Sequence, residues 1–291
     1  MTSKLAAQLG PFGVWRGTQQ VTAELGAELD RLGYGALWLG GSPAAELRIV
    51  DELLAATAAL TVGTSIVNMW QADPATVASS FSRIEASFPG RFVLGVGAGH
   101  REATPEYASP YNTLATYLDR LEAAGVPLQR VVLAALGPRV LQLAADRTAG
   151  AIPYLVPAEH TRTARQILGP DKLLAPEHKV VLDTDPASAR GLGGSRVRTP
   201  YLGLVNYTSN LRRLGYTDAD LSGNGSEQLI DAVVAHGSAQ QVAGHLRAHL
   251  DAGADHVCIQ LLTHADADPV PQYAELARAL GLQERAQRTD A

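Results

Sequence analysis

The sequence has very little cysteine, little excess charge of either sign and no long apolar run. Cys258 is the only cysteine among 291 residues, so no intrachain disulfide can form, which fits a cytoplasmic location. The formal net charge is −5, from 24 basic and 29 acidic residues. Without a basic surplus, neither nucleic acid nor an anionic membrane is an expected partner.

The longest uncharged stretch rich in apolar residues, Leu53 to Trp70, is interrupted by Gly63, Asn68 and several hydroxyl side chains. A membrane-spanning helix needs about 20 predominantly apolar residues, so this stretch predicts the end of a helix followed by a strand. The first ten residues contain one lysine and no long apolar run, so no targeting segment is expected.

Several catalytic motifs are missing as well. The sequence has neither the G-x-x-x-x-G-K-[ST] motif of P-loop nucleotidases nor the G-x-S-x-G motif of serine esterases. His245 and His249 are spaced to share a helix face, but no H-E-x-x-H motif contains them. We therefore expect no metal site.

What the chain does contain is a recurring unit, in which a stretch with helical apolar spacing precedes a short apolar run. In one copy, Leu25, Leu29 and Leu32 precede a glycine-containing turn and the apolar run 36–39. Amphipathic helices that alternate with short apolar strands indicate βαβ units and a parallel sheet. Helix starts are also readable, as a capping box at 238–241 and as the Asp-Pro pairs at 73–74 and 185–186.

Eight strands are predicted over the chain, which favours a single (β/α)8 TIM-barrel domain spanning residues 1–291, with an open doubly wound sheet as the alternative. The less regular stretch 187–225 predicts an inserted helical segment. The predicted strands are Gly10–Val14, Ala36–Leu39, Thr61–Val67, Phe92–Gly97, Arg130–Ala134, Gly150–Ile152, Lys179–Asp183 and His256–Leu261.

The stretch FVLGVGAGH, residues 92–100, resembles the start of the dinucleotide-binding motif G-x-G-x-x-G. Its sixth position is His100 instead of glycine, and three predicted units precede it, although the motif belongs to the first. A barrel strand explains the stretch better, because active sites of such barrels lie at the carboxyl ends of the strands. That position predicts that Ala98, Gly99 and His100 line a site.

Seven short segments resemble the luciferase-like flavin oxidoreductases, most closely their actinobacterial F420-dependent branch. They occur in family order along nearly the whole chain. The segments are 35–38 (GALW), 63–65 (GTS), 89–97 (PGRFVLGVG), 134–138 (AALGP), 149–155 (AGAIPYL), 201–207 (YLGLVNY) and 252–257 (AGADHV). The resemblance implies a TIM barrel with a deazaflavin or flavin at its carboxyl face, a homodimer and a small-molecule substrate.

The resemblance also implies which residues bind the cofactor. A non-prolyl cis peptide at Ser65-Ile66 would lie behind the ring, and Asn68 could hydrogen-bond it. The phosphate would lie at Leu136, Gly137, Pro138 and Arg139, where free amides and the positive end of a helix attract an anion. Tyr154 and Leu155 match a further contact to the cofactor tail.

Two departures from the family bear on catalysis. F420-dependent sugar-phosphate dehydrogenases carry an Asp-His pair where this chain has Gly40-Gly41-Ser42, and a glutamate where it has His100. Neither that substrate nor that acid–base pair carries over. His100 remains the candidate proton donor or acceptor, because a histidine titrates near neutral pH; a binding or structural role is the alternative.

The predicted function is hydride transfer between F420 and a small organic substrate that the sequence does not identify. The alternatives are an FMN-dependent monooxygenase and a barrel that binds the cofactor without turnover. Trp15, Trp38 and Trp70 follow or lie in the first three predicted strands, and could wall a substrate pocket or pack in the core.

Overall fold

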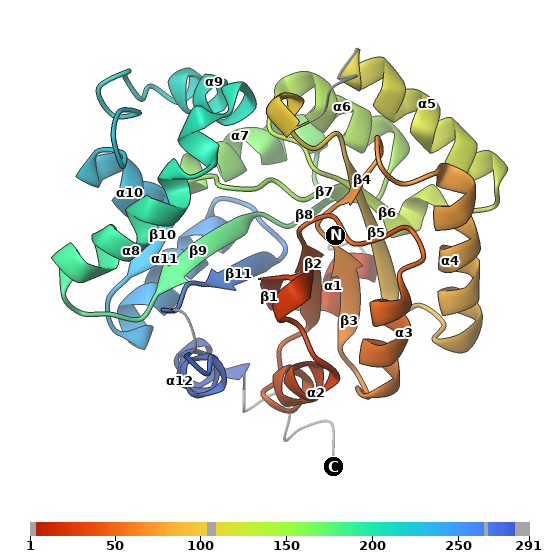
Figure 1. Cartoon of the computed structure of the whole chain (residues 1–291), viewed down its shortest axis with the longest axis horizontal. Coiled ribbons are helices and arrows are strands. Elements are labelled where there is room, and N and C mark those ends of the chain that lie inside the picture. Colours follow the sequence, from red (N-terminus) through yellow and green to blue (C-terminus); the bar gives the residue numbers. More distant parts are fainter. Residues whose placement is uncertain (1–3, 104–108, 265–266, 283–291) are drawn as a thin grey trace.

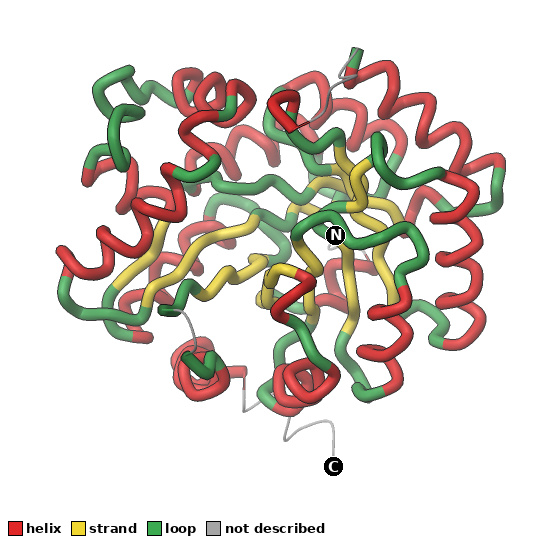
Figure 2. The backbone as a smooth tube through the Cα atoms, viewed as in Figure 1, coloured by secondary structure: helices red, strands yellow, loops and turns green. Residues whose placement is uncertain are grey.

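The computed structural model describes residues 4–103, 109–264 and 267–282. Eleven strands, all paired in parallel, form one curled sheet that helices surround (Figures 1 and 2). The strands are β1 (Phe12–Gly17), β2 (Ala36–Gly40), β3 (Thr61–Thr64), β4 (Val67–Asn68), β5 (Phe92–Gly97), β6 (Val131–Leu133), β7 (Gly150–Ala151), β8 (Leu173–Leu174), β9 (Glu177–Val181), β10 (Val234–His236) and β11 (Val257–Leu261).

The α-helices alternate with these strands. They are α1 (Lys4–Leu9), α2 (Ala23–Arg31), α3 (Arg48–Ala55), α4 (Pro74–Ser87), α5 (Pro110–Ala123), α6 (Pro138–Arg147), α7 (Ala158–Leu168), α8 (Pro186–Arg198), α9 (Val205–Arg213), α10 (Glu227–Val233), α11 (Ala239–Asp251) and α12 (Val270–Leu280). Short 3-10 turns lie at Thr18–Gln20, Arg101–Ala103, Leu128–Arg130 and Tyr201–Gly203, the last labelled η4. Among the described helices, none is both long and apolar enough to cross a membrane.

The order of the strands distinguishes the two predicted architectures. From β1 to β8 the strands lie side by side in chain order, apart from β4, whereas the order reverses in a doubly wound sheet. Strands β8 and β9 belong to one extended segment, 173–181. Ala175 N in this segment donates to Ala151 O beside β7 (3.0 Å), while β9 pairs with β11, which pairs with β1. The ladder therefore returns to its start, and the predicted TIM-barrel fold is confirmed.

The helix starts read from the sequence are confirmed too. Ser238 and Gln241 form the capping box of α11, and the Asp73 and Asp185 side chains accept from backbone amides at the starts of α4 and α8. The ring of outer helices closes where α12 packs beside α2 (Figure 1). There the Tyr34 hydroxyl donates to the Tyr273 carbonyl at 2.9 Å.

Some predicted strands differ from those observed. Strand β10, which pairs with β9, was not predicted, because it follows α10 directly without a turn residue between them. The predicted strand Thr61–Val67 is divided into β3 and β4 at Ser65-Ile66. Strand β8 was not predicted either. Four predicted strands begin at other residues, since β1 starts at Phe12, β6 at Val131, β9 at Glu177 and β11 at Val257.

The interior of the barrel has its own small core, separate from the larger core between strands and outer helices. Trp38 is fully buried in it, and α1 contributes Leu5 and Leu9 to its amino-terminal end. A β-carbon on Gly63 of the neighbouring strand would lie 2.4 Å from the Trp38 ring, so glycine makes room for the indole. Of the two roles left open for Trp38, the structure shows core packing.

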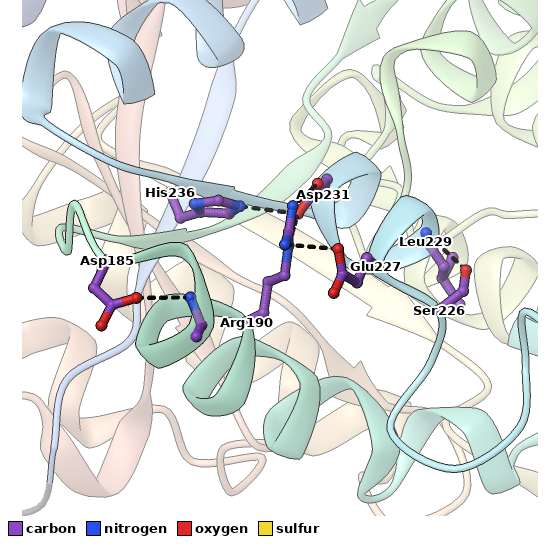
Figure 3. Close-up of polar contacts among 8 residues, drawn as sticks. Asp185, Arg190, Ser226, Glu227, Leu229, Asp231 and His236 are labelled. Carbon is purple, nitrogen blue, oxygen red and sulfur yellow. Dashed lines mark hydrogen bonds and ion pairs between the residues drawn. The ribbon is translucent and has the colours of Figure 1, made fainter.

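The predicted inserted segment contains α8, η4 and α9, and together with α10 and β10 it builds a third hydrophobic core. Arg190 of α8 ties the segment to α10 through ion pairs with Glu227 (2.8 Å) and Asp231 (2.7 Å), as Figure 3 shows. Asp231 also contacts His236 of β10 at 2.9 Å. The helices of the insertion are therefore attached to the strand beside β9.

Candidate functional site

The carboxyl end of β3 carries the peptide geometry that the resemblance implies. The Ser65-Ile66 peptide bond is cis, and both residues are half-buried. The Ser65 hydroxyl accepts a hydrogen bond from Trp15 Nε1 at 3.0 Å, which joins the end of β1 to this turn. Asn68 follows in β4, and its Oδ1 accepts from the Trp70 amide at 3.1 Å.

The glycines of the stretch 92–100 serve two purposes. Gly95 is inside the barrel, where a β-carbon would lie 1.9 Å from the Thr64 carbonyl oxygen; it therefore allows β3 and β5 to approach. Gly99 has φ +58°, a conformation that favours glycine, and lies against the Asn68 side chain. Part of the glycine pattern thus comes from strand packing and not from a ligand.

His100 lies just past this strand, half-buried, with its ring near two tyrosines of the insertion. The ring centroids of His100 and Tyr207 are 5.7 Å apart, and those of His100 and Tyr201 are 6.5 Å apart. Burial lowers the pKa of His100, although Glu102 opposes the shift. Its Nδ1 is buried and has no hydrogen-bond partner within the described residues. A neutral imidazole with a free nitrogen can accept or pass on a proton.

The turn predicted to hold phosphate ends at the amino terminus of α6. Gly137 is the N-cap residue, Pro138 occupies the first turn, and no side chain caps the free amides. Leu136 is half-buried, and its carbonyl oxygen contacts His160 Nε2 at 2.9 Å. The turn therefore presents amides without a built-in side-chain acceptor, which suits an anion.

The positive charge at this turn comes from a residue that the sequence did not single out. The Arg139 guanidinium is exposed and lies over the Tyr111 ring, 4.6 Å from its centroid. Arg213 of α9 instead reaches Gly137, since Nη2 would be 3.8 Å from a β-carbon placed there. Its Nη2 also donates to Asn210 Oδ1 at 3.1 Å.

Asn210 of α9 is linked to this turn through Arg213. The side chain is 3% exposed, and its Nδ2 has no hydrogen-bond partner within the described part of the chain. A buried donor without a partner costs free energy, on the order of 1–3 kcal/mol, unless a ligand or water satisfies it. A phosphate at the Gly137 amides would provide such an acceptor, so the residues present fit an anionic cofactor tail.

Tyr154 and Leu155, predicted to contact the cofactor tail, have different surroundings. Tyr154 is half-buried, its hydroxyl donates to Gln260 Oε1 at 2.8 Å, and its ring packs 5.3 Å from that of Trp15. Leu155 is buried in the core of the insertion, so only its backbone is available to a ligand. Its amide already donates to Glu177 Oε2 at 2.9 Å.

A buried ion pair that the sequence analysis did not identify lies against the Tyr154 ring. Glu177 and Lys179 of β9 are at most 1% exposed, and Lys179 Nζ lies 3.1 Å from Glu177 Oε1. Burial raises the pKa of Glu177 and lowers that of Lys179, and each partner opposes the shift of the other. The alternation of Glu177 and Lys179 in one strand was the available signal, because such residues share a face of the sheet.

The structure thus brings most of the predicted site residues to one end of the barrel. Ser65, Ile66, Ala98, Gly99 and His100 lie at neighbouring strand ends, since β4 pairs with β5. The turn at Gly137 follows β6, the next strand in the sheet. Arg139 is the exception, because its guanidinium is directed to Tyr111.

Two residues considered for other chemistry have structural partners. His249 is buried, with Nε2 3.0 Å from His178 Nδ1 and Nδ1 2.8 Å from Thr161 Oγ1. Within the described ranges no cluster of three potential metal ligands occurs. Cys258 is a free, fully buried cysteine, and burial raises the pKa of its thiol.

Comparison with known proteins agrees with this geometry. Residues 12–122 match the family model described as luciferase-like monooxygenase. This match bears out the resemblance to the luciferase-like family over that part of the chain. A curated relative, the 4-hydroxyprotoasukamycin monooxygenase of Streptomyces nodosus subsp. asukaensis, is 39% identical over an alignment of 83 residues that covers 26% of this chain. The match covers only 22% of that relative's length.

Solved structures share the fold over nearly the whole chain. An F420-dependent secondary alcohol dehydrogenase, in complex with an F420-acetone adduct, has a TM-score of 0.69 at 14% identity and covers 94% of this chain and 99% of its own. The oxygenating constituent of 3,6-diketocamphane monooxygenase from Pseudomonas putida, in complex with FMN, has a TM-score of 0.67 at 14% identity and covers 96% and 99%. At these identities the two structures show a shared fold, and the proteins that have it include an F420-dependent dehydrogenase and an FMN-containing monooxygenase.

Proposed function

We propose that the protein is an F420-dependent oxidoreductase that transfers a hydride between the deazaflavin and a small organic substrate. The observation that carries this proposal is the arrangement of two features on either side of β5, at the carboxyl end of the barrel. One is the half-buried strand end at Ser65-Ile66, and the other is the uncapped turn at Gly137 with Arg213 and with Asn210 Nδ2, which has no partner within the described residues. A flat ring and an anionic tail together match this pair of features.

Different residues would bind the ring, the phosphate and the tail of the cofactor. Ser65 and Ile66 would back the ring, with Asn68, Ala98 and Gly99 at its edge. The amides from Leu136 to Arg139 would hold the phosphate, and Arg213 would supply the charge that the resemblance assigns to Arg139. The Tyr154 ring and the Leu155 backbone would border the tail. When bound, F420 supplies the hydride chemistry, and the protein supplies orientation and electrostatics.

His100 is the proposed proton-handling residue. It lies one residue beyond Gly99, and its buried Nδ1 is free of partners among the residues described. Because burial lowers the pKa of His100, the ring is neutral near pH 7 and can take up a proton from a substrate hydroxyl.

A second candidate, an FMN-dependent monooxygenase, is favoured by the curated relative. The local identity of 39% is to a monooxygenase, although it covers only 83 residues. Both candidates use the same face of the barrel, so the cofactor distinguishes them.

Separate fluorescence titrations of the protein with F420 and with FMN test the proposal. We expect saturable binding of F420 that is at least tenfold tighter than binding of FMN. Tight FMN binding without measurable F420 affinity would overturn the proposal and favour the monooxygenase, which would then show oxygen-dependent hydroxylation. Binding of neither cofactor would contradict both candidates.

A further inference from the structure

A chain of hydroxyl groups crosses the carboxyl end of the barrel and ends at Tyr201. The hydroxyls of Tyr201 and Tyr154 are 2.8 Å apart, and Tyr154 donates to Gln260 Oε1 at 2.8 Å. The Tyr154 hydroxyl thus donates a hydrogen bond to Gln260 and accepts one from the Tyr201 hydroxyl. Among the described residues this series of hydroxyl groups ends at Tyr201, so the Tyr201 hydroxyl can turn toward a ligand while Tyr154 keeps its bond to Gln260.

The buried amine of Lys179 lies directly against these two rings. Lys179 Nζ is 4.0 Å from the Tyr154 ring centroid and 5.0 Å from that of Tyr201. Desolvated cations interact strongly with aromatic rings. Because Glu177 pairs with Lys179, the group has a strong dipole but no net charge.

This hydroxyl chain lies beside the residues proposed for the reaction. Tyr201 is 6.5 Å from His100 between ring centroids, and Tyr154 is 5.3 Å from Trp15, which bonds Ser65. Contacts between side chains therefore connect Ser65 to His100 through Trp15, Tyr154 and Tyr201. We call Trp15, Tyr154 and Tyr201, with the Lys179 amine behind them, the wall of the site. A substrate that lies over the cofactor ring proposed at Ser65-Ile66 would contact this wall.

We propose that the Tyr201 hydroxyl binds the oxygen of a neutral carbonyl substrate, or of the alcohol that corresponds to it, and that Lys179 and Tyr154 are positioning residues for Tyr201. The inference deepens the proposed hydride transfer and rests on it. The chemistry follows from three features of the wall. A phenol can donate to a carbonyl oxygen and accept from a hydroxyl, which are the two oxygen forms of one redox couple.

The other two features restrict the substrate. Lys179 is already paired with Glu177, so no uncompensated cation is present in the wall to bind a substrate carboxylate or phosphate. The half-buried rings of Trp15 and Tyr154 offer aromatic surface for an apolar body. Burial raises the pKa of Tyr201 to about 12, so the phenol keeps its proton at neutral pH and can donate it.

A carbonyl dye tests the inference without cofactor or turnover. The absorption of p-dimethylaminocinnamaldehyde moves to longer wavelength when a hydrogen-bond donor polarises its carbonyl oxygen. We expect the full-length protein to bind this aldehyde with such a shift. Tyr201→Phe should lose most of the shift and bind about tenfold more weakly, because it removes one hydrogen bond.

Tyr207→Phe is the matched control, since Tyr207 belongs to the same ring cluster but not to the hydroxyl chain, and should keep the shift. For Lys179, the double variant Lys179→Met with Glu177→Gln removes both charges and leaves no buried ion alone. It should bind the aldehyde but show a smaller shift, with thermal unfolding confirming that it is folded.

Each outcome decides the inference independently of F420. A shift that persists in Tyr201→Phe, a shift lost equally in Tyr207→Phe, or no dye binding by the wild-type protein would overturn it. Failure of F420 to bind, with the dye results as expected, would instead overturn the proposed cofactor and leave the carbonyl-binding role of Tyr201 standing.

Discussion

Each end of the barrel contains a histidine, and the two histidines have different surroundings. At the amino-terminal end, His256 is fully buried and both ring nitrogens are used: Nε2 is 3.0 Å from Trp38 Nε1, and Nδ1 is 2.7 Å from the Gly10 carbonyl. At the carboxyl end, His100 is only half-buried and its Nδ1 has no partner among the described residues. A satisfied polar group contributes to folding, whereas a free one can bind a ligand.

The same difference extends to other polar groups at the two ends of the barrel. Trp38 fills the space left by Gly63 and fixes His256, so the amino-terminal end is closed by packing. At the other end, Asn210 Nδ2 lacks a partner within the described ranges, and the amides of α6 are not capped by a side chain. Substitutions at the two ends should therefore affect different properties of the protein.

The largest effect is expected at Trp38. Trp38→Ala should lower the free energy of unfolding by about 3–5 kcal/mol, because it leaves a cavity among well-packed neighbours. Denaturant unfolding measures this, and Trp15→Ala, at the half-buried carboxyl end, is the matched control with a smaller loss. Equal losses for the two variants would break the contrast between the ends.

A second effect should appear as acid destabilisation. Burial lowers the pKa values of His256 and His249 to about 4, below the unfolded value of about 6.5. The unfolded chain then binds more protons, so stability is fully present above pH 6.5 and declines by a few kcal/mol as the pH falls toward 4.

Denaturant unfolding at a series of pH values measures this slope. His256→Asn should lower the stability at neutral pH and flatten the decline below pH 6.5, since one of the two groups no longer titrates. A slope identical to that of the wild-type protein would show that His256 does not titrate as the structure indicates.

His100→Ala should lower turnover and leave stability nearly unchanged, the opposite of the substitutions at the amino-terminal end. We expect turnover to fall about 100-fold, the lower range for loss of a general acid or base, while stability changes little. Because burial lowers the pKa of His100, wild-type turnover should be constant above pH 6.5 and fall at more acidic pH as the ring is protonated. A stability loss without loss of turnover would assign His100 to packing.

The smallest effect is expected at Arg213. Arg213→Met should weaken F420 binding about three- to tenfold, since one exposed cation near the phosphate is removed. Arg212→Met is the control on the same helix, because Arg212 bonds Asp218 instead (2.9 Å). If both variants bound F420 equally well, the charge at the α6 turn would have another source.

Local signals in the sequence predicted the fold well. The apolar runs, the capping box at Ser238 and the Asp-Pro helix starts depend on a few neighbouring residues, and each appears in the structure. Strand β10 was missed because it is three residues long and continues from α10 without a break. Its place beside β9 is determined by the insertion and not by its own sequence.

The candidate site was less predictable from the sequence. The cis peptide at Ser65-Ile66 followed from the family resemblance, and the structure contains it. The Glu177–Lys179 pair was not identified, and Tyr201 and Arg213 lay in the predicted insertion without an assigned role, because these residues reach the site from inside the barrel or from the insertion. Their convergence depends on how segments distant in sequence pack together.

A crystal structure of the protein with F420 bound tests the central claim most directly. We expect the deazaflavin ring against the Ser65-Ile66 peptide, with His100 beside it, and the phosphate on the Gly137 amides within reach of Arg213 and Asn210. A ring bound elsewhere on the barrel, or a phosphate that leaves Asn210 Nδ2 without a partner, would contradict the assignment of the carboxyl end as the cofactor site.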